Sequence, residues 1–389
     1  MTHRIAFFVF ALAVLLAGCR ALQVDRAAVV SADDWLTEGA TPERTHAYPG
    51  PVAPPLQELW DYNAGAGFGA VSPLIVGETV LVATRKGEVH AIDLATGRKA
   101  GMNDFGEAVE GTPVVQSGTL YVPLAWGRRV LYAYDLALGR TRWRVEGDPI
   151  QAGVLALPGA IVVADAGGHV RALAPADGSE RWAHALEEGR GVVATPVLAG
   201  GRILVADDQG GVAALDPGSG TLGWARQLDA PVYAAFTAGA EAAYLPTTRG
   251  RFYALDAATG AVRWRLALPD TTVHLGPPAL QGDLLVFGAS DGVVRALDAT
   301  TGAVVWATRL PDALTAPPLI TPEWVYVGTM GRELLALRRN DGEVRWQYTL
   351  RGRIKSAMAA REGHLVVLAE PRFVHYFKSA SVPDDVATR

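Results

Sequence analysis

Short apolar runs separated by turn residues fill the chain from about residue 70 onward. Residues 190–230 show the pattern, with short, mostly apolar runs at 194–198, 202–206 and 212–215 and a fourth run that carries Trp224. Runs of four to six such residues between Gly- and Asp-rich turns are typical of strands joined by hairpins. No run between the turns is long enough for a helix. The pattern therefore predicts an all-β protein built from units of four short strands.

The four-strand unit repeats with a period near 40 residues. Tryptophans mark six copies, at spacings of 39, 42, 40, 42 and 40 residues: Trp143, Trp182, Trp224, Trp264, Trp306 and Trp346. A glycine precedes each tryptophan by four residues: Gly139, Gly178, Gly220, Gly260, Gly302 and Gly342. A further copy at 91–97 keeps the aspartate and the glycine, but Gly101 stands where its tryptophan is expected. Four strands per repeat of this length describe the blade of a β-propeller.

The repeated aspartate, glycine and tryptophan each have a structural interpretation. A tight turn between the third and fourth strands needs a positive φ, which glycine adopts at little cost. The aspartate that begins the turn can accept hydrogen bonds from the backbone two residues on. The tryptophan offers a large flat face that fills the wedge between neighbouring blades. We interpret the glycines and tryptophans as blade-docking residues, in preference to a role in stacking on a ligand.

Counting the copies indicates how the ring closes. Full four-strand copies begin near residues 109, 150, 190, 231, 271 and 313, and the copy at 71–105 makes seven. The last segment, 353–378, has only three strands, whereas 56–61 stands before the first blade and supplies the extra tryptophan, Trp60. We expect this N-terminal strand to complete the last blade, which removes two exposed sheet edges. The prediction is an eight-bladed β-propeller of four-stranded antiparallel blades over 56–378, followed by a tail at 379–389.

The N-terminus has the pattern of a bacterial lipoprotein. The apolar run at 5–16 is too short to span a bilayer, and 1–18 is typical of a cleavable signal peptide. The Leu-Ala-Gly that precedes Cys19 resembles a lipobox, which implies cleavage before Cys19 and acylation of its thiol, usually with palmitate. An ordinary signal peptide with an incidental cysteine is the alternative. Residues 19–55 are rich in proline towards their end, so we expect the lipidated cysteine to be followed by a flexible, extended tether.

Composition narrows the chemistry. Cys19 is the only cysteine, so neither an intramolecular disulfide nor a cysteine-based zinc site can form. The net charge of −5 shows no basic excess, and we expect no nucleic-acid partner. The histidines have no metal-binding spacing, and the glycine-rich stretch 65–69 opens no helix that could bind a dinucleotide. We interpret the acidic pairs at 187–188 and 207–208 as solvated turns. The sequence therefore predicts no catalytic, metal-binding or cofactor-binding residue and no enzyme activity.

The repeat resembles the tryptophan-docking motif of quinoprotein propellers, which include dehydrogenases that bind pyrroloquinoline quinone. Those enzymes are longer, place a disulfide of adjacent cysteines beside the quinone, and carry calcium and a catalytic acid on inserted loops. This chain has no second cysteine, and its blades of 39–42 residues are lean. The resemblance thus implies the architecture, and a quinone dehydrogenase remains a remote alternative.

The lipobox, the proline-rich segment and the eight-bladed repeat together resemble the BamB family of outer-membrane protein assembly lipoproteins. The entry stretch at 60–67, Trp-Asp-Tyr-Asn-Ala-Gly-Ala-Gly, is similar to that family's first strand and glycine-rich exit. The resemblance implies a non-catalytic scaffold that docks on the POTRA domains of the barrel-inserting subunit. Arg20 follows the cysteine in place of the aspartate associated with inner-membrane retention, so we expect a lipid anchor on the periplasmic face of the outer membrane.

The residues that bind the partner are not evident in the sequence. The family's docking loop is an interblade segment containing leucine and arginine, and the stretch compared with it here, 228–235, lacks the arginine. Arg351 lies in a similar local sequence, 350–352, in a later loop, and is the one candidate. A solvated loop is the other interpretation of Arg351. The alternative function is a tethered propeller that binds another envelope protein, or a small ligand in its central channel.

Overall fold

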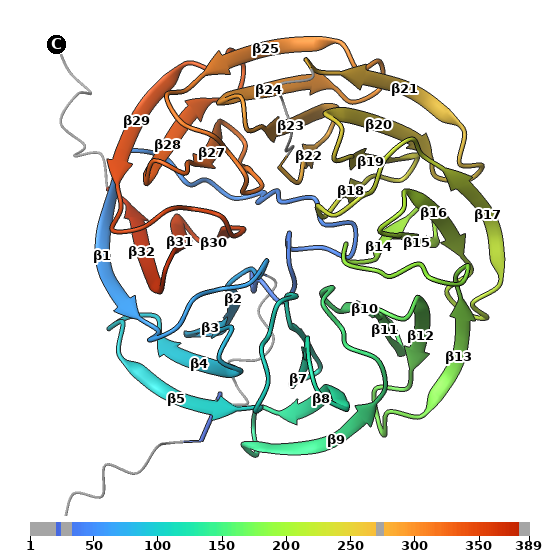
Figure 1. Ribbon diagram of the computed structural model, residues 1–389. Coiled ribbons are helices and arrows are strands. Elements are labelled where there is room, and N and C mark those ends of the chain that lie inside the picture. The colour runs from blue at the N-terminus through green and yellow to red at the C-terminus, as the bar shows by residue number, and fades with distance from the viewer. Residues whose placement is uncertain (1–20, 25–32, 270–275, 381–389) are drawn as a thin grey trace, which may run out of the picture.

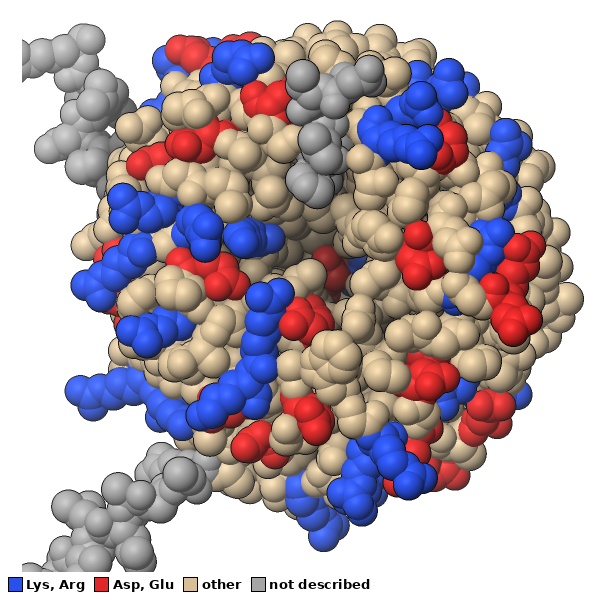
Figure 2. Space-filling view, viewed as in Figure 1, with Lys and Arg blue, Asp and Glu red and all other residues tan. Residues whose placement is uncertain are grey.

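The computed structural model describes residues 21–24, 33–269 and 276–380, and the regular structure in these ranges is entirely β. Thirty-two strands form eight separate sheets of four strands each. The sheets are arranged as a ring (Figure 1), and the space-filling view shows the mouth of a central channel (Figure 2). The described residues contain no helix that is long and apolar enough to cross a membrane. The fold class predicted from the repeat, an eight-bladed β-propeller, is confirmed.

Each blade is an antiparallel sheet whose strands follow chain order from the channel outward. Blade 1 consists of β2 (Leu74–Val76), β3 (Thr79–Ala83), β4 (Glu88–Asp93) and β5 (Lys99–Asp104), and blade 2 of β6 (Val114–Gln116), β7 (Thr119–Pro123), β8 (Arg129–Asp135) and β9 (Arg140–Glu146). Blade 3 consists of β10 (Leu155–Leu157), β11 (Ala160–Ala164), β12 (His169–Leu173) and β13 (Glu180–Ala185), and blade 4 of β14 (Val197–Ala199), β15 (Arg202–Ala206), β16 (Gly211–Leu215) and β17 (Leu222–Gln227). Blade 5 consists of β18 (Thr237–Ala238), β19 (Ala242–Pro246), β20 (Arg251–Asp256) and β21 (Val262–Ala267), and blade 6 of β22 (Ala279–Gln281), β23 (Leu284–Gly288), β24 (Val293–Asp298) and β25 (Val304–Arg309). Blade 7 consists of β26 (Leu319–Ile320), β27 (Trp324–Gly328), β28 (Glu333–Arg338) and β29 (Val344–Thr349).

Blade 8 is built from both ends of the propeller sequence. Its three inner strands are β30 (Ala359–Arg361), β31 (His364–Ala369) and β32 (Phe373–Ser379), and its outermost strand is β1 (Leu56–Asn63). β1 pairs antiparallel with β32, from Leu56 opposite Ser379 to Asn63 opposite Phe373. The predicted closure by the N-terminal strand is therefore confirmed, and the last strand ends at Ser379, one residue beyond the predicted boundary.

The hydrophobic core lies between the blades. In blade 4 the two middle strands, β15 and β16, are buried almost throughout, whereas the outermost strand β17 is mostly exposed. Middle strands are covered on both faces by neighbouring blades, so they are continuous apolar runs without alternation. We call the face with the interblade connections the loop face, and the opposite face, with the third-to-fourth strand turns, the turn face. The interblade connections lie on the near side in Figure 1.

Tryptophans join six of the eight blades to the next blade of the ring. Trp182 of blade 3 covers Gly220 in the third-to-fourth strand turn of blade 4, and its indole N–H donates a hydrogen bond to the Pro217 carbonyl at 2.9 Å. Gly220 has a φ of +70°, and a Cβ on it would overlap the indole. The same packing joins Trp60 to Gly97, Trp143 to Gly178, Trp224 to Gly260, Trp264 to Gly302 and Trp306 to Gly342. Trp346 has no such turn to cover, because blade 8 is interrupted there, and stacks on Tyr348.

Residues 21–24 occupy the position of the missing tryptophan in blade 1. The Gln23 side chain covers Gly139, in the turn of blade 2, and a Cβ on Gly101 would overlap the Ala21 carbonyl. The backbone N–H of Val24 donates to the Leu136 carbonyl at 2.9 Å. Leu136 follows the turn aspartate, as do the carbonyls that accept the indole bonds in other blades. We call this space the tryptophan slot. A short backbone segment thus makes the hydrogen bond that an indole makes elsewhere in the ring.

The segment predicted to be a flexible tether is instead packed against the propeller: residues 21–24 fill the tryptophan slot, and residues 35–48 pass inside the ring. Trp35, Arg44, His46 and Val52 are each no more than 2% exposed. The prediction of a flexible tether is therefore wrong for these residues. Their proline-rich composition does indicate an extended chain, but this extended chain makes hydrogen bonds with the blades. The innermost strand of a blade is a sheet edge, whose free N–H groups point into the channel and need acceptors. Cys19 and its lipidation lie outside the described residues.

Residues 35–48 supply those acceptors as they pass around the channel, and we call them the belt. The belt accepts a backbone N–H from the innermost strand of six blades: Ile75 to Trp35, Val115 to Leu36, Leu198 to Pro42, Ala238 to Glu43, Leu280 to Thr45 and Ile320 to His46. The remaining two blades are contacted by side chains: Arg44 donates to Val154 of blade 3, and the Tyr48 hydroxyl accepts from Glu362 of blade 8. One segment therefore contacts all eight blades.

Candidate functional site

The central channel is closed by a buried ion pair of the belt. Arg44 and Glu38 lie 2.7 Å apart with side chains only 1% and 7% exposed. The Arg44 guanidinium also donates to the Pro196 and Val154 carbonyls, both at 3.3 Å. Burial raises the pKa of Glu38, although the neighbouring Arg44 cation opposes this shift. Burial and the same cation lower the pKa of His46 to about 3, so this imidazole is neutral at physiological pH.

The belt divides the channel into two cavities. The cavity on the loop face has a volume of about 250 Å³, with Glu38 among its lining residues and Thr195, Tyr233 and Lys355 contributed by interblade loops. The cavity on the turn face has a volume of about 630 Å³ and is lined mainly by belt residues and first-to-second strand turns.

Pyrroloquinoline quinone, which the fold class suggests, does not fit the residues of this channel. Glu38 is the one carboxylate that lines the loop-face cavity, and it is already paired with Arg44, so no free acidic side chain of that lining could hold the calcium. The other lining residues are mostly small, such as Ala70, Gly111 and Ala235. The single cysteine excludes the disulfide that the enzymes place beside the quinone. The structure therefore supplies no step that would involve this cofactor.

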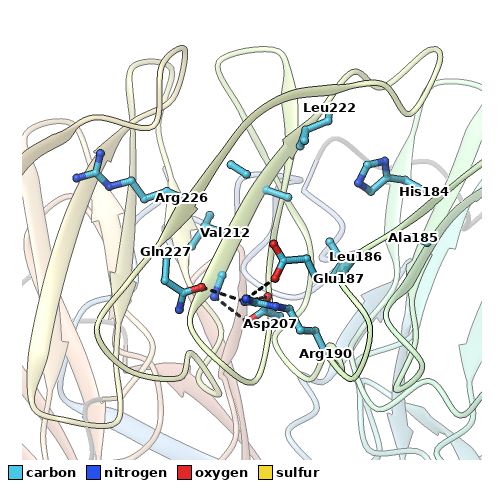
Figure 3. Close-up of a pocket in the computed structure, with 13 residues that line it drawn as sticks. His184, Ala185, Leu186, Glu187, Arg190, Asp207, Val212, Leu222, Arg226 and Gln227 are labelled. Carbon is cyan, nitrogen blue, oxygen red and sulfur yellow. Dashed lines mark hydrogen bonds and ion pairs between the residues drawn. The ribbon is translucent and has the colours of Figure 1, made fainter.

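A groove lies on the outside of the ring between blades 3 and 4 (Figure 3). Its volume is about 320 Å³, and it is bounded by the end of β13, the loop that leads to blade 4, and the strands β16 and β17. Leu186, Val212 and Leu222 give the groove an apolar lining, and Leu222 is 45% exposed. The groove therefore offers an apolar surface next to a loop that carries charged side chains.

Arg190 lies at one side of this groove and is held rigidly. Its guanidinium contacts Glu187 at 2.6 Å, Asp207 at 3.0 Å and the Gln227 amide oxygen at 3.0 Å, as the dashed lines in Figure 3 show. The hydrogen bond that Arg190 donates to the Asp207 carboxylate is the main cause that raises the pKa of Arg190. Asp207 is only 4% exposed and also accepts the backbone N–H of Gly211. The interpretation of this aspartate as a solvated turn is therefore wrong, since it orients the arginine.

A leucine and an arginine occur together one interblade loop earlier than the stretch that the sequence comparison used. The loop from Leu186 to Arg190 joins blade 3 to blade 4 and contains both residue types. The sequence comparison used 228–235, between blades 4 and 5, whose Tyr233 is 53% exposed at the mouth of the channel. The signal that could have located Arg190 is the partner aspartate in the next blade. This pairing is visible only once the blades are placed side by side.

The sequence-based candidate Arg351 lies in the loop between blades 7 and 8. It pairs with Asp61 of β1 at 2.9 Å, and its guanidinium lies 5.8 Å from the ring centre of Phe373. Its side chain is 66% exposed, and it does not line any of the cavities described above. A role for Arg351 in binding a partner stays a prediction.

One cluster of possible metal ligands occurs in the described part of the chain. The ligand atoms of Asp148, Asp165 and His169 lie within 4.8 Å of one another near the second-to-third strand turn of blade 3. Asp165 already accepts the backbone N–H groups of Gly167 and His169, at 3.0 and 2.9 Å. These bonds give the buried carboxylate a role in shaping the turn.

The fold and the filled channel define the class of protein as an eight-bladed propeller of the quinoprotein type whose channel is closed by its own chain. The family described as outer membrane protein assembly factor BamB matches residues 57–210, 166–316 and 290–379, and the chain belongs to this family. No curated protein sequence matches the chain.

Solved structures show the same architecture at low sequence identity. BamB from Moraxella catarrhalis is 19% identical with a TM-score of 0.70, over 83% of this chain and 99% of that one. Quinohemoprotein alcohol dehydrogenase from Comamonas testosteroni is 15% identical with a TM-score of 0.76, over 92% of this chain and 83% of that one. The computationally designed protein Ika8 is 13% identical with a TM-score of 0.71, over 83% of this chain and 99% of that one. At these identities the likeness concerns the fold, which enzymes and non-enzymes share.

Proposed function

We propose that the protein is a non-catalytic scaffold of outer-membrane β-barrel assembly, anchored through a lipid on Cys19 at the periplasmic face of the outer membrane. Membership of the BamB family supports the scaffold role. The belt supports the absence of quinone chemistry, because it occupies the channel axis and uses the one carboxylate of the loop-face cavity. The partner is a barrel-inserting subunit with POTRA domains, as the family resemblance implies.

The groove between blades 3 and 4 is the proposed docking site. The observation that carries this assignment is the loop of Leu186 and Arg190 beside a preformed apolar hollow. Asp207 and Gln227 fix the guanidinium before any partner arrives, so binding does not have to order a long side chain. Leucine and arginine next to each other offer a partner an apolar contact and a directional hydrogen-bond donor.

Binding of a soluble fragment containing the POTRA domains to the mature chain tests the site. The variants are Leu186→Asp, which leaves the Arg190 network in place, and Arg190→Ala. We expect each variant to weaken binding at least about tenfold, as hot-spot residues do. Arg351→Ala is the matched control, an exposed arginine in the equivalent loop between blades 7 and 8, and we expect it to bind normally. Loss of binding in the control alone would move the docking site to blades 7 and 8.

The alternatives have their own tests. If the mature chain recovers no POTRA-bearing protein from envelope extracts, and a deletion strain keeps its normal outer-membrane protein levels, the scaffold proposal fails. A tethered propeller that binds another envelope protein would then be the better account. Addition of pyrroloquinoline quinone with calcium is expected to cause no spectral change in the mixture, and a change that depends on the protein would revive the dehydrogenase alternative.

A further inference from the structure

The loop face carries a cluster of cations where blades 7 and 8 meet. Interblade loops and second-to-third strand turns both lie on this face, because the four strands of a blade alternate in direction. The loop between blades 7 and 8, at 350–358, contains three cations and no acidic residue, and the second-to-third strand turns of these blades add one cation each. Figure 2 shows Lys and Arg gathered over this part of the ring and reaching the central hollow. We call these side chains the basic patch: Arg332, Arg351, Arg353, Lys355 and Arg372.

The charge of the basic patch is only partly compensated by its own surroundings. Arg351 pairs with Asp61 at 2.9 Å. The other four cations are exposed and form no ion pair with any described residue. Two acidic side chains close to them in sequence, Glu333 and Glu370, accept hydrogen bonds from a threonine hydroxyl at 2.9 Å and from a backbone N–H at 3.2 Å. Positive charge therefore remains for an anionic group of a partner.

Contacts within the chain hold the basic patch in a fixed arrangement. The backbones of Arg353 and Glu370 exchange two N–H···O hydrogen bonds, at 3.1 and 2.7 Å, which join the loop between blades 7 and 8 to the turn of blade 8. The guanidinium groups of Arg351 and Arg372 lie 5.8 and 6.0 Å from the ring centre of Phe373. Cations placed over an aromatic ring are attracted to it. A partner therefore meets cations that are already ordered, and its binding costs less conformational entropy.

The basic patch extends into the mouth of the channel. Lys355 lines the loop-face cavity of about 250 Å³, and so does Tyr233, which comes from the loop between blades 4 and 5. Tyr233 is 53% exposed, whereas the other lining residues are mostly small. A concave site with a cation and an exposed aromatic ring is suited to side chains that project from a peptide. A flat membrane surface reaches the exposed cations but not the inside of the cavity.

We propose that the basic patch binds an acidic, extended segment of a second protein, which runs over the loop between blades 7 and 8 to the mouth of the channel. Its carboxylates contact the arginines and Lys355, because guanidinium groups donate paired hydrogen bonds to carboxylates. An apolar side chain of the segment packs against Tyr233. The groove proposed to bind POTRA domains lies across the ring, at the boundary of blades 3 and 4, so the propeller can hold two proteins at once. This inference goes beyond the proposed function and uses no residue of that groove.

A labelled synthetic peptide, in which glutamate alternates with serine around one central phenylalanine, tests the basic patch in the mature chain with Cys19→Ser. We expect it to bind with an affinity that falls as salt rises, and we expect no binding when glutamine replaces the glutamates. Removal of three cations should weaken binding at least about tenfold: Arg353→Gln, Lys355→Gln and Arg372→Gln. The matched control removes three exposed arginines from blades 3 and 5 and should bind the peptide normally: Arg181→Gln, Arg249→Gln and Arg265→Gln.

A substitution at Tyr233 distinguishes a built site from general attraction between charges. Tyr233→Ala leaves the charge unchanged, so it should weaken binding of the phenylalanine peptide several-fold and leave binding of a peptide with alanine at that place unaffected. Equal affinity of the two peptides for the unmodified tyrosine chain would overturn the placement of the segment at the channel mouth.

The outcomes separate a protein segment from a membrane. Loss of peptide binding in the patch variant, with retention in the control variant, supports the proposal. Equal loss in both variants, or no binding of the acidic peptide at low salt, overturns it. Binding to vesicles that contain phosphatidylglycerol, lost in the patch variant and without any binding of the peptide, assigns the patch to a membrane and also overturns it. The patch variant should bind the POTRA fragment normally, so failure here is distinguishable from failure of the proposed function.

Discussion

At the scale of single residues, the belt places strongly polar groups where apolar ones would be expected. Arg44 and Glu38 are buried in the channel, but every partner they need is nearby: each other and the carbonyls of blades 3 and 4. A buried ion pair contributes little net stability compared with apolar residues, yet losing one partner leaves a buried charge uncompensated. The Arg44–Glu38 pair therefore fixes the position of the belt more than it adds to the stability of the fold.

Removal of one member of the Arg44–Glu38 pair should lower the free energy of unfolding more than removal of both. We expect Arg44→Met to lower the free energy of unfolding by about 3–5 kcal/mol, because Glu38 is left without its cation. The double variant Glu38→Leu, Arg44→Met should recover a large part of this loss. Urea denaturation of the mature chain measures both. A double variant as unstable as the single one would show that the pair is not coupled as its 2.7 Å separation indicates.

The buried imidazole of His46 should make stability depend on pH. The pKa of His46 is about 3 in the folded chain, against an ordinary value of 6.5, so the unfolded chain binds the additional proton between these values. Stability is therefore lost as pH falls below 6.5, and this group accounts for about 2 kcal/mol by pH 5. His46→Asn removes the titration and tolerates the φ of +49° at this position. The unmodified chain should lose about 2 kcal/mol of unfolding free energy relative to the His46→Asn variant as pH falls from 7 to 5, and a difference that stays constant would contradict the shift.

At the scale of elements, the contact between an outermost strand and the next blade's turn is the repeated joint of the ring. It consists of one indole, one glycine with positive φ and one hydrogen bond to the carbonyl after the aspartate, as in Trp182 on Gly220. The tryptophan slot shows which parts of the joint matter. When the indole is missing, a backbone N–H and an amide side chain reproduce both the hydrogen bond and the cover over the glycine.

Two glycine substitutions distinguish the energetic cost of a left-handed backbone from the cost of a steric clash with the indole. Gly201 and Gly220 have similar φ values of +77° and +70°, but a Cβ meets nothing within 4 Å at Gly201 and overlaps the Trp182 indole at Gly220. We expect Gly201→Ala to cost about 1 kcal/mol for the left-handed conformation alone. Gly220→Ala should cost about 1–3 kcal/mol more, because the joint is overpacked. Equal losses in thermal or urea unfolding would mean that the indole moves aside freely.

The sequence repeat allows most of the fold to be predicted, whereas it does not reveal most of the candidate site. The count of blades followed from Trp60 and the three-stranded C-terminal segment, because a propeller blade needs a fourth strand. The missing tryptophan at Gly101 was visible in the sequence, but a backbone N–H that replaces an indole has no residue signature. The contacts of the belt could not be predicted for the same reason, since its partners are backbone groups of the innermost strands. The Arg190–Asp207 pair joins two blades, and spacing along the chain does not reveal such contacts.

At the scale of the whole molecule, the ring is held from outside and from inside by the same N-terminal segment. β1 closes blade 8 at the rim, and the belt ties all eight blades together at the channel. Stability is thus not simply a sum over neighbouring blades, as in an open repeat array. The segment that reads as a linker in the sequence is a structural part of the propeller.

A chain that begins at residue 49 should keep the propeller but loosen its centre. We expect it to unfold at a lower temperature, because the six innermost-strand N–H groups lose their belt acceptors and Trp35 and Tyr48 no longer fill the channel. Hydrogen exchange measures this directly. The amides of Leu198, Ala238 and Leu280 should exchange much faster than in the full chain, whereas amides of the middle strands stay protected. Unchanged exchange at these amides would show that the belt is dispensable.

The belt also sets an order on how the molecule can be completed. It is among the first parts of the chain to be synthesised, yet its partners extend from Trp35's neighbour Ile75 to Glu362, close to the other end. The acceptors of the belt therefore meet their donors blade by blade as the chain is made, from Ile75 to Ile320. The contact with blade 8 is completed only once Glu362 has been made. A chain that stops short of Glu362 leaves Tyr48, at the end of the belt, without this partner, so the belt is complete only when the ring is.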